Sequence, residues 1–288
     1  MSRTVKAQHP AVRDDIADLV TRRPLPGANL AQLDPFLFLN HHGPQVYPPG
    51  NRGLPFGPHP HRGFETVSFI IAGEMAHLDS AGFESVIRTG GVQWMTAGRG
   101  LIHAEVSPED FKRDGGPLEI LQLWLNLPAR LKMTEPAYVG EQADAMPVVE
   151  LADGGFMQLI SGEHKGRTGP IVSRTGVCMA TVTMATNSGI ALPAPRGRQV
   201  FFYLVRGELV SHGETLKPHH LIEWNGDGDV IALEARSESL IAFGHADPIG
   251  EPIVSYGPFV MNTREEIELA IRDYQAGRFG REPQIASR

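Results

Sequence analysis

Residues 61–75 read HRGFETVSFIIAGEM, and residues 195–209 read PRGRQVFFYLVRGEL. Aligned at an offset of 134 residues, the two stretches share Arg-Gly at the start, Gly-Glu near the end and an apolar run between them. Each apolar run is rich in aromatic and β-branched residues, which is typical of a strand. An offset of this length is not the period of a solenoid. We therefore predict two copies of one β-domain.

The remaining sequence favours the same fold class. The chain has 288 residues, of which 32 are Gly and 23 are Pro, and such a content favours short elements joined by tight turns. Apolar residues alternate or run together at residues 67–71, 121–127, 177–184, 200–205 and 240–243. This spacing predicts an all-β sandwich or barrel. The segment 129–146 resembles a connector, so we divide the chain into domains 1–140 and 141–288.

One helix signal is clear. Thr263 and Glu266 form a Thr-x-x-Glu capping box, and Ile267, Ala270, Ile271 and Tyr274 follow at helical spacing. Gly277 suits the position just past a helix end. These residues predict a C-terminal helix over about 264–276, with an apolar face that packs on a barrel. A weaker signal suggests a second helix around Asp14–Val20.

Composition limits the function classes. The formal net charge is −7, and Lys and Arg occur in no run of five or more, so we expect no direct nucleic-acid binding and no anionic membrane partner. No run of 18 apolar residues could span a bilayer, and the first residues lack an apolar signal-peptide core. Cys178 is the single cysteine, and its apolar neighbours predict a buried, inert thiol. We expect a cytoplasmic protein and a monomer.

The residues most directly linked to chemistry are two short pairs. In a strand, residues i and i+2 project from the same face, so His59 and His61 can approach one ion together. About forty residues later, His103 and Glu105 repeat this spacing with one imidazole and one carboxylate. Two adjacent strands, each with one pair, would supply four mixed nitrogen and oxygen ligands. We predict a metal site formed by His59, His61, His103 and Glu105.

The donor set narrows the choice of metal. Without a thiolate, an iron–sulfur cluster or a thiolate zinc site is excluded. Three imidazoles and a carboxylate suit Fe(II), with Mn, Ni, Cu, Co and Zn as competitors. Glu65 is an alternative ligand, because it shares the strand parity of His61. A bulge at Gly63 would change that parity, so the sequence leaves the choice between Glu65 and Glu105 open.

The internal repeat offers a control for the metal site. At the same offset, His59 corresponds to Pro193, His61 to Pro195 and Glu65 to Gln199. The region that matches His103 and Glu105 is Ile231–Leu233, which contains no metal-binding side chain. The second copy keeps the strand pattern without the ligands. The histidines are therefore not required by the strand itself, and we expect one site per chain.

Three longer motifs point to a known family. HPHRGFETVSFIIAGEM (59–75), GGVQWMTAGRGLIHAE (90–105) and YGPFVMNTREEIELAIRDYQAGRFGR (256–281) closely resemble the pirin family of the cupin superfamily. The resemblance covers roughly residues 30–280. It implies two tandem jelly-roll (cupin) barrels with metal only in the N-terminal one. It also implies the ligands His59, His61, His103 and Glu105, which places Glu65 outside the direct ligand set.

The resemblance allows more than one function. Several pirins are similar in activity to quercetin 2,3-dioxygenase, which implies a flavonol substrate opened with O2 and Glu105 as a catalytic base. Others are described as iron-dependent redox regulators that bind protein partners. A third reading is another metal-dependent cupin, such as an isomerase. Arg62 and Arg99 near the ligands keep this third reading open, although hydrogen bonding that supports the site is the expected role of both.

The other histidines are predicted to have no part in metal binding. Asn40, His41 and His42 depart from the stretch expected in many relatives, and we predict that His41 and His42 lie on a loop surface. The remaining histidines lie in polar or turn-like contexts and are predicted to be structural or solvated: His77, His164, His212, His219, His220 and His245.

Overall fold

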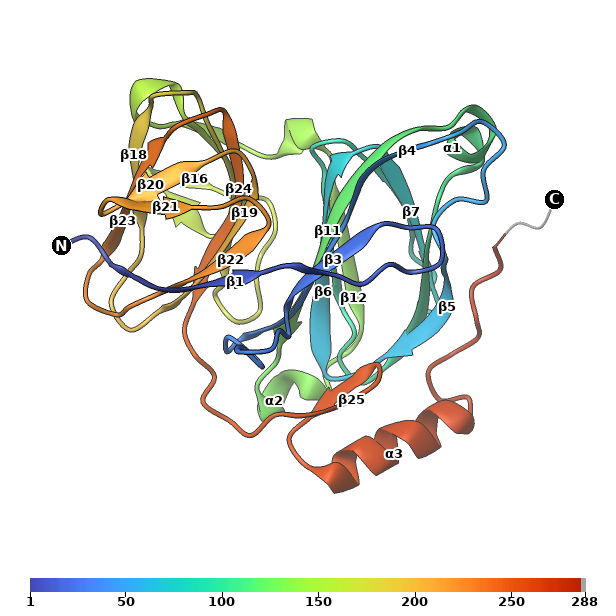
Figure 1. The fold of residues 1–288 in the computed structure, drawn as a ribbon. Helices are drawn as coiled ribbons and strands as arrows, with labels where there is room; N and C mark the ends of the chain where they lie inside the picture. Colours follow the sequence, from blue (N-terminus) through green and yellow to red (C-terminus); the bar gives the residue numbers. More distant parts are fainter. Residues whose placement is uncertain (286–288) are drawn as a thin grey trace. The chain divides into compact units, whose positions relative to one another are not determined.

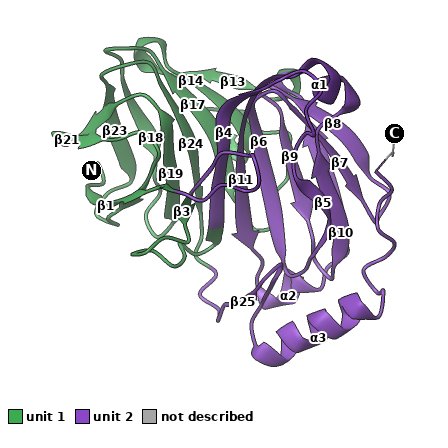
Figure 2. Ribbon diagram, turned by 45° about the vertical axis from the view of Figure 1, so that its right-hand side comes forward, with its two compact units in different colours: residues 1–12, 23–37, 144–248 green, residues 13–22, 38–143, 249–288 purple. Residues whose placement is uncertain are grey.

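The structure is a computed structural model that describes residues 1–285, and it is all-β with one longer helix near the C-terminus (Figure 1). The chain forms two compact units (Figure 2). Unit 1 comprises residues 1–12, 23–37 and 144–248, and unit 2 comprises residues 13–22, 38–143 and 249–288. The predicted division at residues 140 and 141 concerns the two copies of the repeat and stays a prediction. Each compact unit also contains residues from the other predicted domain. Unit 1 includes residues 1–12 and 23–37, and unit 2 includes residues from 249 onward.

Unit 2 carries the segment 59–75 and is built on two antiparallel sheets. The larger sheet has the order β12 (Ala137–Glu141), β9 (Val92–Thr96), β6 (Phe64–Ala72), β11 (Gly116–Asn126), β4 (Phe36–Tyr47), β3 (Thr21–Leu25) and β2 (Val12–Arg13). The smaller sheet has the order β5 (Phe56–His61), β10 (Leu101–Val106), β7 (Glu74–Asp79) and β8 (Glu84–Arg88). The predicted connector 129–146 contributes to this unit, because β12 pairs with β9. Two short helices, α1 (Glu109–Asp114) and α2 (Ala129–Lys132), lie between strands.

Unit 1 repeats this strand order. Its larger sheet runs β1 (Val5–Pro10), β22 (His220–Trp224), β19 (Gln199–Arg206), β24 (Ser239–Ala246), β17 (Cys178–Met184), β14 (Phe156–Ser161) and β13 (Val148–Glu150). Its smaller sheet runs β18 (Gly189–Pro193), β23 (Val230–Ala235), β20 (Leu209–Ser211) and β21 (Glu214–Leu216). The remaining short elements are η1 (Ala143–Ala145), η2 (Ala152–Gly154), β15 (Glu163–His164) and β16 (Arg167–Thr168). The two-domain cupin fold is confirmed.

In the second copy, the strands that correspond to the histidine-bearing strands β5 and β10 are β18 and β23. These two strands pair with each other as β5 pairs with β10, and Ala191 lies opposite Ala232. Leu192, Ile231 and Leu233 belong to one buried apolar cluster of unit 1. Burial of such side chains stabilises a barrel by about 25 cal/mol for each Å² removed from water. This copy therefore holds its strands together by backbone pairing and apolar packing.

The predicted C-terminal helix is confirmed as α3 (Arg264–Gln275). Thr263 caps it as predicted, because its side chain accepts from the Glu266 amide while the Glu266 carboxylate accepts from the Thr263 amide. Ahead of α3 lies the hairpin β25 (Val254–Tyr256) and β26 (Phe259–Met261). Buried Ile267 and Ala270 pack in one cluster with Ile102 of β10. The apolar face of the helix thus lies against the strand that carries His103.

Two expectations about local structure are wrong. The segment Asp14–Val20 is not helical, because its backbone forms a tight turn closed by an isolated bridge between Ile16 and Leu19. His41 and His42 are not on a loop surface. Both lie on β4 and are buried, His41 beside Glu119 at 3.1 Å and His42 beside Thr21 at 2.9 Å. The polar sequence suggested a loop, but the neighbouring strands bury these rings.

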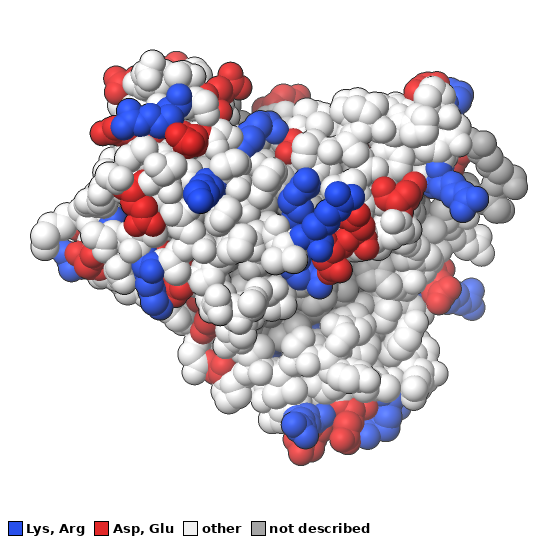
Figure 3. Space-filling view, in the orientation of Figure 1, with Lys and Arg blue, Asp and Glu red and all other residues white. Residues whose placement is uncertain are grey.

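The surface agrees with the mixed charge of the sequence. On the face shown in Figure 3, Lys and Arg side chains lie scattered among Asp and Glu side chains. Within residues 1–285, no helix is both long and apolar enough to cross a membrane. The expectations about nucleic acid and location stay predictions.

Candidate metal centre

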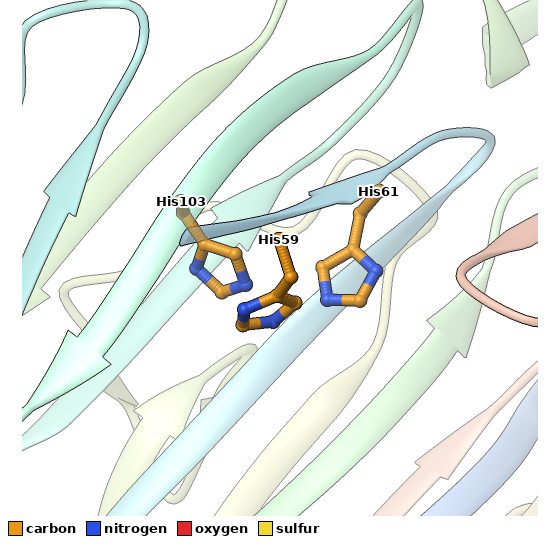
Figure 4. Close-up of side chains that lie close together, drawn as sticks. All are labelled: His59, His61 and His103. Atoms are coloured by element: carbon orange, nitrogen blue, oxygen red, sulfur yellow. The ribbon is translucent and has the colours of Figure 1, made fainter. Parts of the chain in front are cut away.

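The three predicted histidines converge in unit 2. His59 and His61 lie on β5, and His103 lies on β10 directly opposite His59 in the antiparallel register. The centroid of the His59 ring lies 4.3 Å from the centroid of the His103 ring and 4.8 Å from that of the His61 ring. One nitrogen from each ring lies within 4.8 Å of the other two, which is close enough to share an ion. Figure 4 shows the three rings turned toward one another.

Backbone carbonyls orient two of these rings. His59 Nδ1 lies 2.8 Å from the carbonyl oxygen of Gly57, and His61 Nδ1 lies 3.3 Å from that of Pro258. A carbonyl oxygen can only accept, so both Nδ1 atoms donate and carry the hydrogen. The Nε2 atom of each ring is then the unprotonated one. This is the usual arrangement of a histidine that binds a metal through Nε2.

His103 is the most deeply placed of the three. Its side chain is 0% exposed, and neither ring nitrogen has a hydrogen-bond partner among the described residues. Burial lowers the pKa of His103 well below its usual value, and the nearby His61 and His59 lower it further. Burial likewise lowers the pKa of His61, with a smaller contribution from His59. Both rings are therefore neutral near pH 7 and offer lone pairs to a cation.

Glu105 is buried beside this cluster but is not a member of it. Ser68 Oγ donates to Glu105 Oε1 at 3.0 Å, Gln93 Nε2 donates to the same oxygen, and Gln122 Nε2 donates to Oε2. A bulge separates His103 and Glu105 in the pairing of β10 with β5. The sequence brings the carboxylate into the interior, and three neutral donors hold it there. Its role as a metal ligand stays a prediction.

Glu65 lies on β6 and takes part in a different contact. Thr96 Oγ1 donates to Glu65 Oε1 at 2.7 Å, and Thr96 lies opposite Glu65 on β9. The three histidines form a cluster in the described chain without Glu65. Glu65 therefore remains an alternative ligand only as a hypothesis.

An aromatic wall borders the histidines. The indole of Trp124 on β11 lies 4.5 Å from the Phe38 ring and 4.4 Å from the Phe64 ring, measured between centroids. The same indole lies 5.3 Å from the ring of His61. Trp124 and Phe38 are only partly buried. Stacked aromatic side chains of this kind suit a flat aromatic ligand beside the ion.

Sequence reasoning missed a second polar pair in this interior. His77, which was assigned a structural or solvated role, lies on β7 with 0% exposure, and its Nε2 lies 3.0 Å from Asp79 Oδ2. Its ring is 5.4 Å from His103 and stacks on Tyr138 at 4.1 Å. His77 and Asp79 have the same i, i+2 spacing that selected the other two pairs. This spacing in the sequence could have identified His77 and Asp79 as a further pair on one strand face.

Arg62 and the C-terminal segment support the strand that carries His61. Arg62 Nη1 contacts Asp273 of α3 at 2.9 Å, and Arg62 Nε donates to the carbonyl of Arg99 at 2.6 Å. The guanidinium also lies 4.6 Å from the centre of the Phe279 ring. This confirms a supporting role for Arg62. Arg99 instead directs its side chain to exposed Glu135.

Comparison with known proteins connects this site to a family. Residues 18–125 match the family model described as Pirin, and residues 179–280 match the model described as Pirin C-terminal cupin domain. A pirin-like protein of Solanum lycopersicum is 38% identical over 265 residues, covering 91% of this chain and 87% of that protein.

Solved structures agree on the fold. A crystal structure of quercetin 2,3-dioxygenase from Acinetobacter baumannii aligns with a TM-score of 0.90 at 31% identity, covering 97% of this chain and 99% of that chain. A bacterial pirin from Escherichia coli, in complex with nickel(II), aligns with a TM-score of 0.66 at 20% identity. That alignment covers 84% of this chain and 99% of the bacterial pirin, and it supports the fold alone.

Proposed function

The chain belongs to the pirin family, and we propose that it binds Fe(II) and cleaves flavonols with O2, as a quercetin 2,3-dioxygenase does. The main supporting observation is the cluster of His59, His61 and His103. Neither ring nitrogen of buried His103 has a hydrogen-bond partner among residues 1–285. Buried polar atoms without a partner are costly, and a bound cation would satisfy one of them. The likeness to the dioxygenase of Acinetobacter baumannii supports the substrate class.

The residues fit an imidazole-rich metal site. In the proposal, His59 and His61 bind through Nε2, His103 binds through one ring nitrogen, and Glu105 completes the set. Such a nitrogen and oxygen set suits Fe(II), while Mn, Ni, Cu, Co and Zn remain competitors. The nickel(II) complex of the bacterial pirin is the reason to test Ni alongside Fe. When bound, the ion would supply a Lewis acid and a redox centre for the reaction with O2.

Glu105 is proposed to accept the proton of the flavonol 3-hydroxyl. Oε1 already accepts two hydrogen bonds, from Ser68 and Gln93, whereas Oε2 accepts one, from Gln122. Each oxygen of a carboxylate can accept about two hydrogen bonds, so Oε2 keeps one accepting position. That one position would hold the ion or, once the carboxylate has left the ion, would receive the hydroxyl proton. The amide donors of Gln93 and Gln122 would hold the carboxylate in place during the transfer.

The aromatic wall would orient the substrate. Phe38 and Trp124 are partly exposed aromatic rings near His61, and buried Phe64 packs against Trp124. A flavonol is flat and aromatic, so its rings can stack on this wall while its oxygens face the histidines. The wall would also limit the access of water to the reacting atoms.

The test of turnover measures O2 consumption and CO release. Iron-loaded protein with quercetin should consume one O2 and release one CO for each flavonol opened. Glu105→Gln should keep the aromatic wall but lose at least about 100-fold in rate, as expected for removal of a general base. Iron-loaded protein that consumes no O2 and releases no CO would contradict the proposal. Such a result would favour the alternative function, an iron-dependent redox regulator that binds protein partners.

The test of the ligand set measures metal content. His59→Ala and Glu105→Ala should each lose stoichiometric metal when purified protein is subjected to elemental analysis. Leu125→Met, a buried volume-conserving change on β11, serves as the control and should keep the metal. Metal that is retained in Glu105→Ala and lost in Glu65→Ala would overturn the assignment of Glu105.

A further inference from the structure

A second histidine–carboxylate pair lies in the same interior as the metal cluster. Along β7 and β10, His77 is directly opposite Glu105, and Asp79 is directly opposite His103. Side chains that lie directly opposite in an antiparallel pair share one face of the sheet. All four side chains are buried. His77 and Asp79 are therefore neighbours of the metal cluster, and the proposed function uses neither of them.

Asp79 is held rigidly and in turn orients His77. Asp79 Oδ1 accepts from the backbone amides of Ala81 at 2.9 Å and Phe83 at 3.1 Å. Its other oxygen, Oδ2, lies 3.0 Å from His77 Nε2. An ionised carboxylate can only accept, so His77 Nε2 carries the hydrogen and donates it. In a neutral ring, Nδ1 is then a hydrogen-bond acceptor.

The Nδ1 atom of His77 has no hydrogen-bond partner among the described residues, although it is buried. The ring stacks on Tyr138, which fixes its plane, and it lies beside His103. Gln93 and Gln122 each direct an amide N–H to Glu105. A buried acceptor without a donor destabilises the folded chain. A donor from a bound molecule would remove this cost.

We propose that His77, oriented by Asp79, contacts the substrate, and that its Nδ1 accepts a hydrogen bond from a ring hydroxyl of a bound flavonol. The inference rests on the proposed function and adds a preference within the substrate class. Flavonols with further hydroxyl groups on the rings bind more tightly than a flavonol that carries the 3-hydroxyl alone. His77 is a substrate-contacting residue, and Asp79 is a positioning residue that acts through it.

Asp79→Asn provides a sharp test because it reverses the hydrogen bond. The Asn carbonyl oxygen can still accept from Ala81 and Phe83, while its amide group now donates to His77 Nε2. Nδ1 must then carry the hydrogen and becomes a donor. His77→Leu removes the acceptor entirely, and His77→Asn keeps an acceptor close to the position of Nδ1. Glu74→Gln is the matched control on β7, because Glu74 is the first residue of that strand and pairs with Arg88.

The experiment measures binding without turnover. Zn(II)-loaded proteins are titrated with quercetin and with 3-hydroxyflavone, and the absorbance shift of each flavonol gives its Kd. One hydrogen bond predicts that wild type and Glu74→Gln prefer quercetin by about tenfold. His77→Leu should reduce this ratio to about one, leave the Kd of 3-hydroxyflavone unchanged and retain zinc. Asp79→Asn should lower the ratio by a smaller amount, because Nδ1–H can no longer accept from the hydroxyl and can only donate to the hydroxyl oxygen. His77→Asn should keep part of the preference.

The outcomes separate this inference from the proposed function. A ratio of about one in wild type, or a ratio unchanged in His77→Leu, overturns the role of His77 even if iron-loaded protein releases CO. If His77→Leu fails to fold or to retain zinc, Asp79→Asn replaces it as the deciding variant, and an unchanged ratio there overturns the role of His77. A preference that depends on His77 supports the inference even if iron-loaded protein releases no CO, and the dioxygenase proposal alone then fails.

Discussion

At the scale of single residues, close approach of the imidazole rings distinguishes the histidines that can share a metal ion from the other buried histidines. His59, His61 and His103 combine close approach with oriented or unpartnered ring nitrogens. The spacing of the two pairs predicted this convergence, because residues i and i+2 share a strand face. The spacing carried no information about the donors around Glu105, whose carboxylate accepts from three side chains on three other strands.

His245 in unit 1 offers a prediction about pH. It is buried on β24, where burial, and secondarily the charge of Arg198, lower the pKa of its imidazole to about 4 from 6.5. Between these values the unfolded chain binds a proton at this residue that the folded chain does not bind. The free energy of unfolding should therefore fall as pH falls from about 6.5 to about 4, by at most about 3 kcal/mol.

Urea unfolding at pH 7, 6, 5 and 4 measures this dependence. His245→Asn removes the titrating group, so its slope of unfolding free energy against pH should be shallower than that of wild type across this range. His220 is partly buried on β22 of the same unit, and His220→Asn serves as the matched control for replacing a histidine by asparagine. Equal slopes for wild type and His245→Asn would show that the pKa of His245 is not lowered by folding.

At the scale of elements, α3 stabilises the strand next to the metal cluster. Asp273 on α3 pairs with buried Arg62 at 2.9 Å and with Arg278 at 2.7 Å. Asp273→Ala would leave the Arg62 guanidinium buried without its carboxylate, which should cost about 3 kcal/mol of unfolding free energy. It should also weaken metal binding, because Arg62 directly follows His61.

Two measurements check the role of α3. Urea unfolding gives the loss of stability, and a metal titration gives the change in Kd. The control is Asp110→Ala, whose pair with Arg113 on α1 is exposed and should contribute nothing measurable. An unchanged Kd for metal in a destabilised Asp273→Ala would mean that the helix supports the fold without positioning His61.

At the scale of the whole molecule, one ion should stabilise the folded chain. A ligand that binds only the folded state adds RT ln(1 + [L]/Kd), which is about 4 kcal/mol when free metal is a thousand times its Kd. Removal of the ion with a chelator should therefore lower Tm by several degrees. Thermal unfolding at a series of free Fe(II) concentrations measures this. His59→Ala should show a Tm that does not depend on metal, and a wild-type Tm with no such dependence would contradict a single tight site.

The sequence by itself determined the fold class, the repeat, α3 with its cap, and the three histidines that cluster in unit 2. Each of these depends on local periodicity or on short spacing, which the chain carries along its own length. Tertiary structure decided what the strands bury. Pairing of β7 with β10 placed His77 and Asp79 beside His103, and packing around β4 buried His41 and His42. These outcomes depend on contacts between segments far apart in the sequence, and a polar residue gives no local signal of such burial.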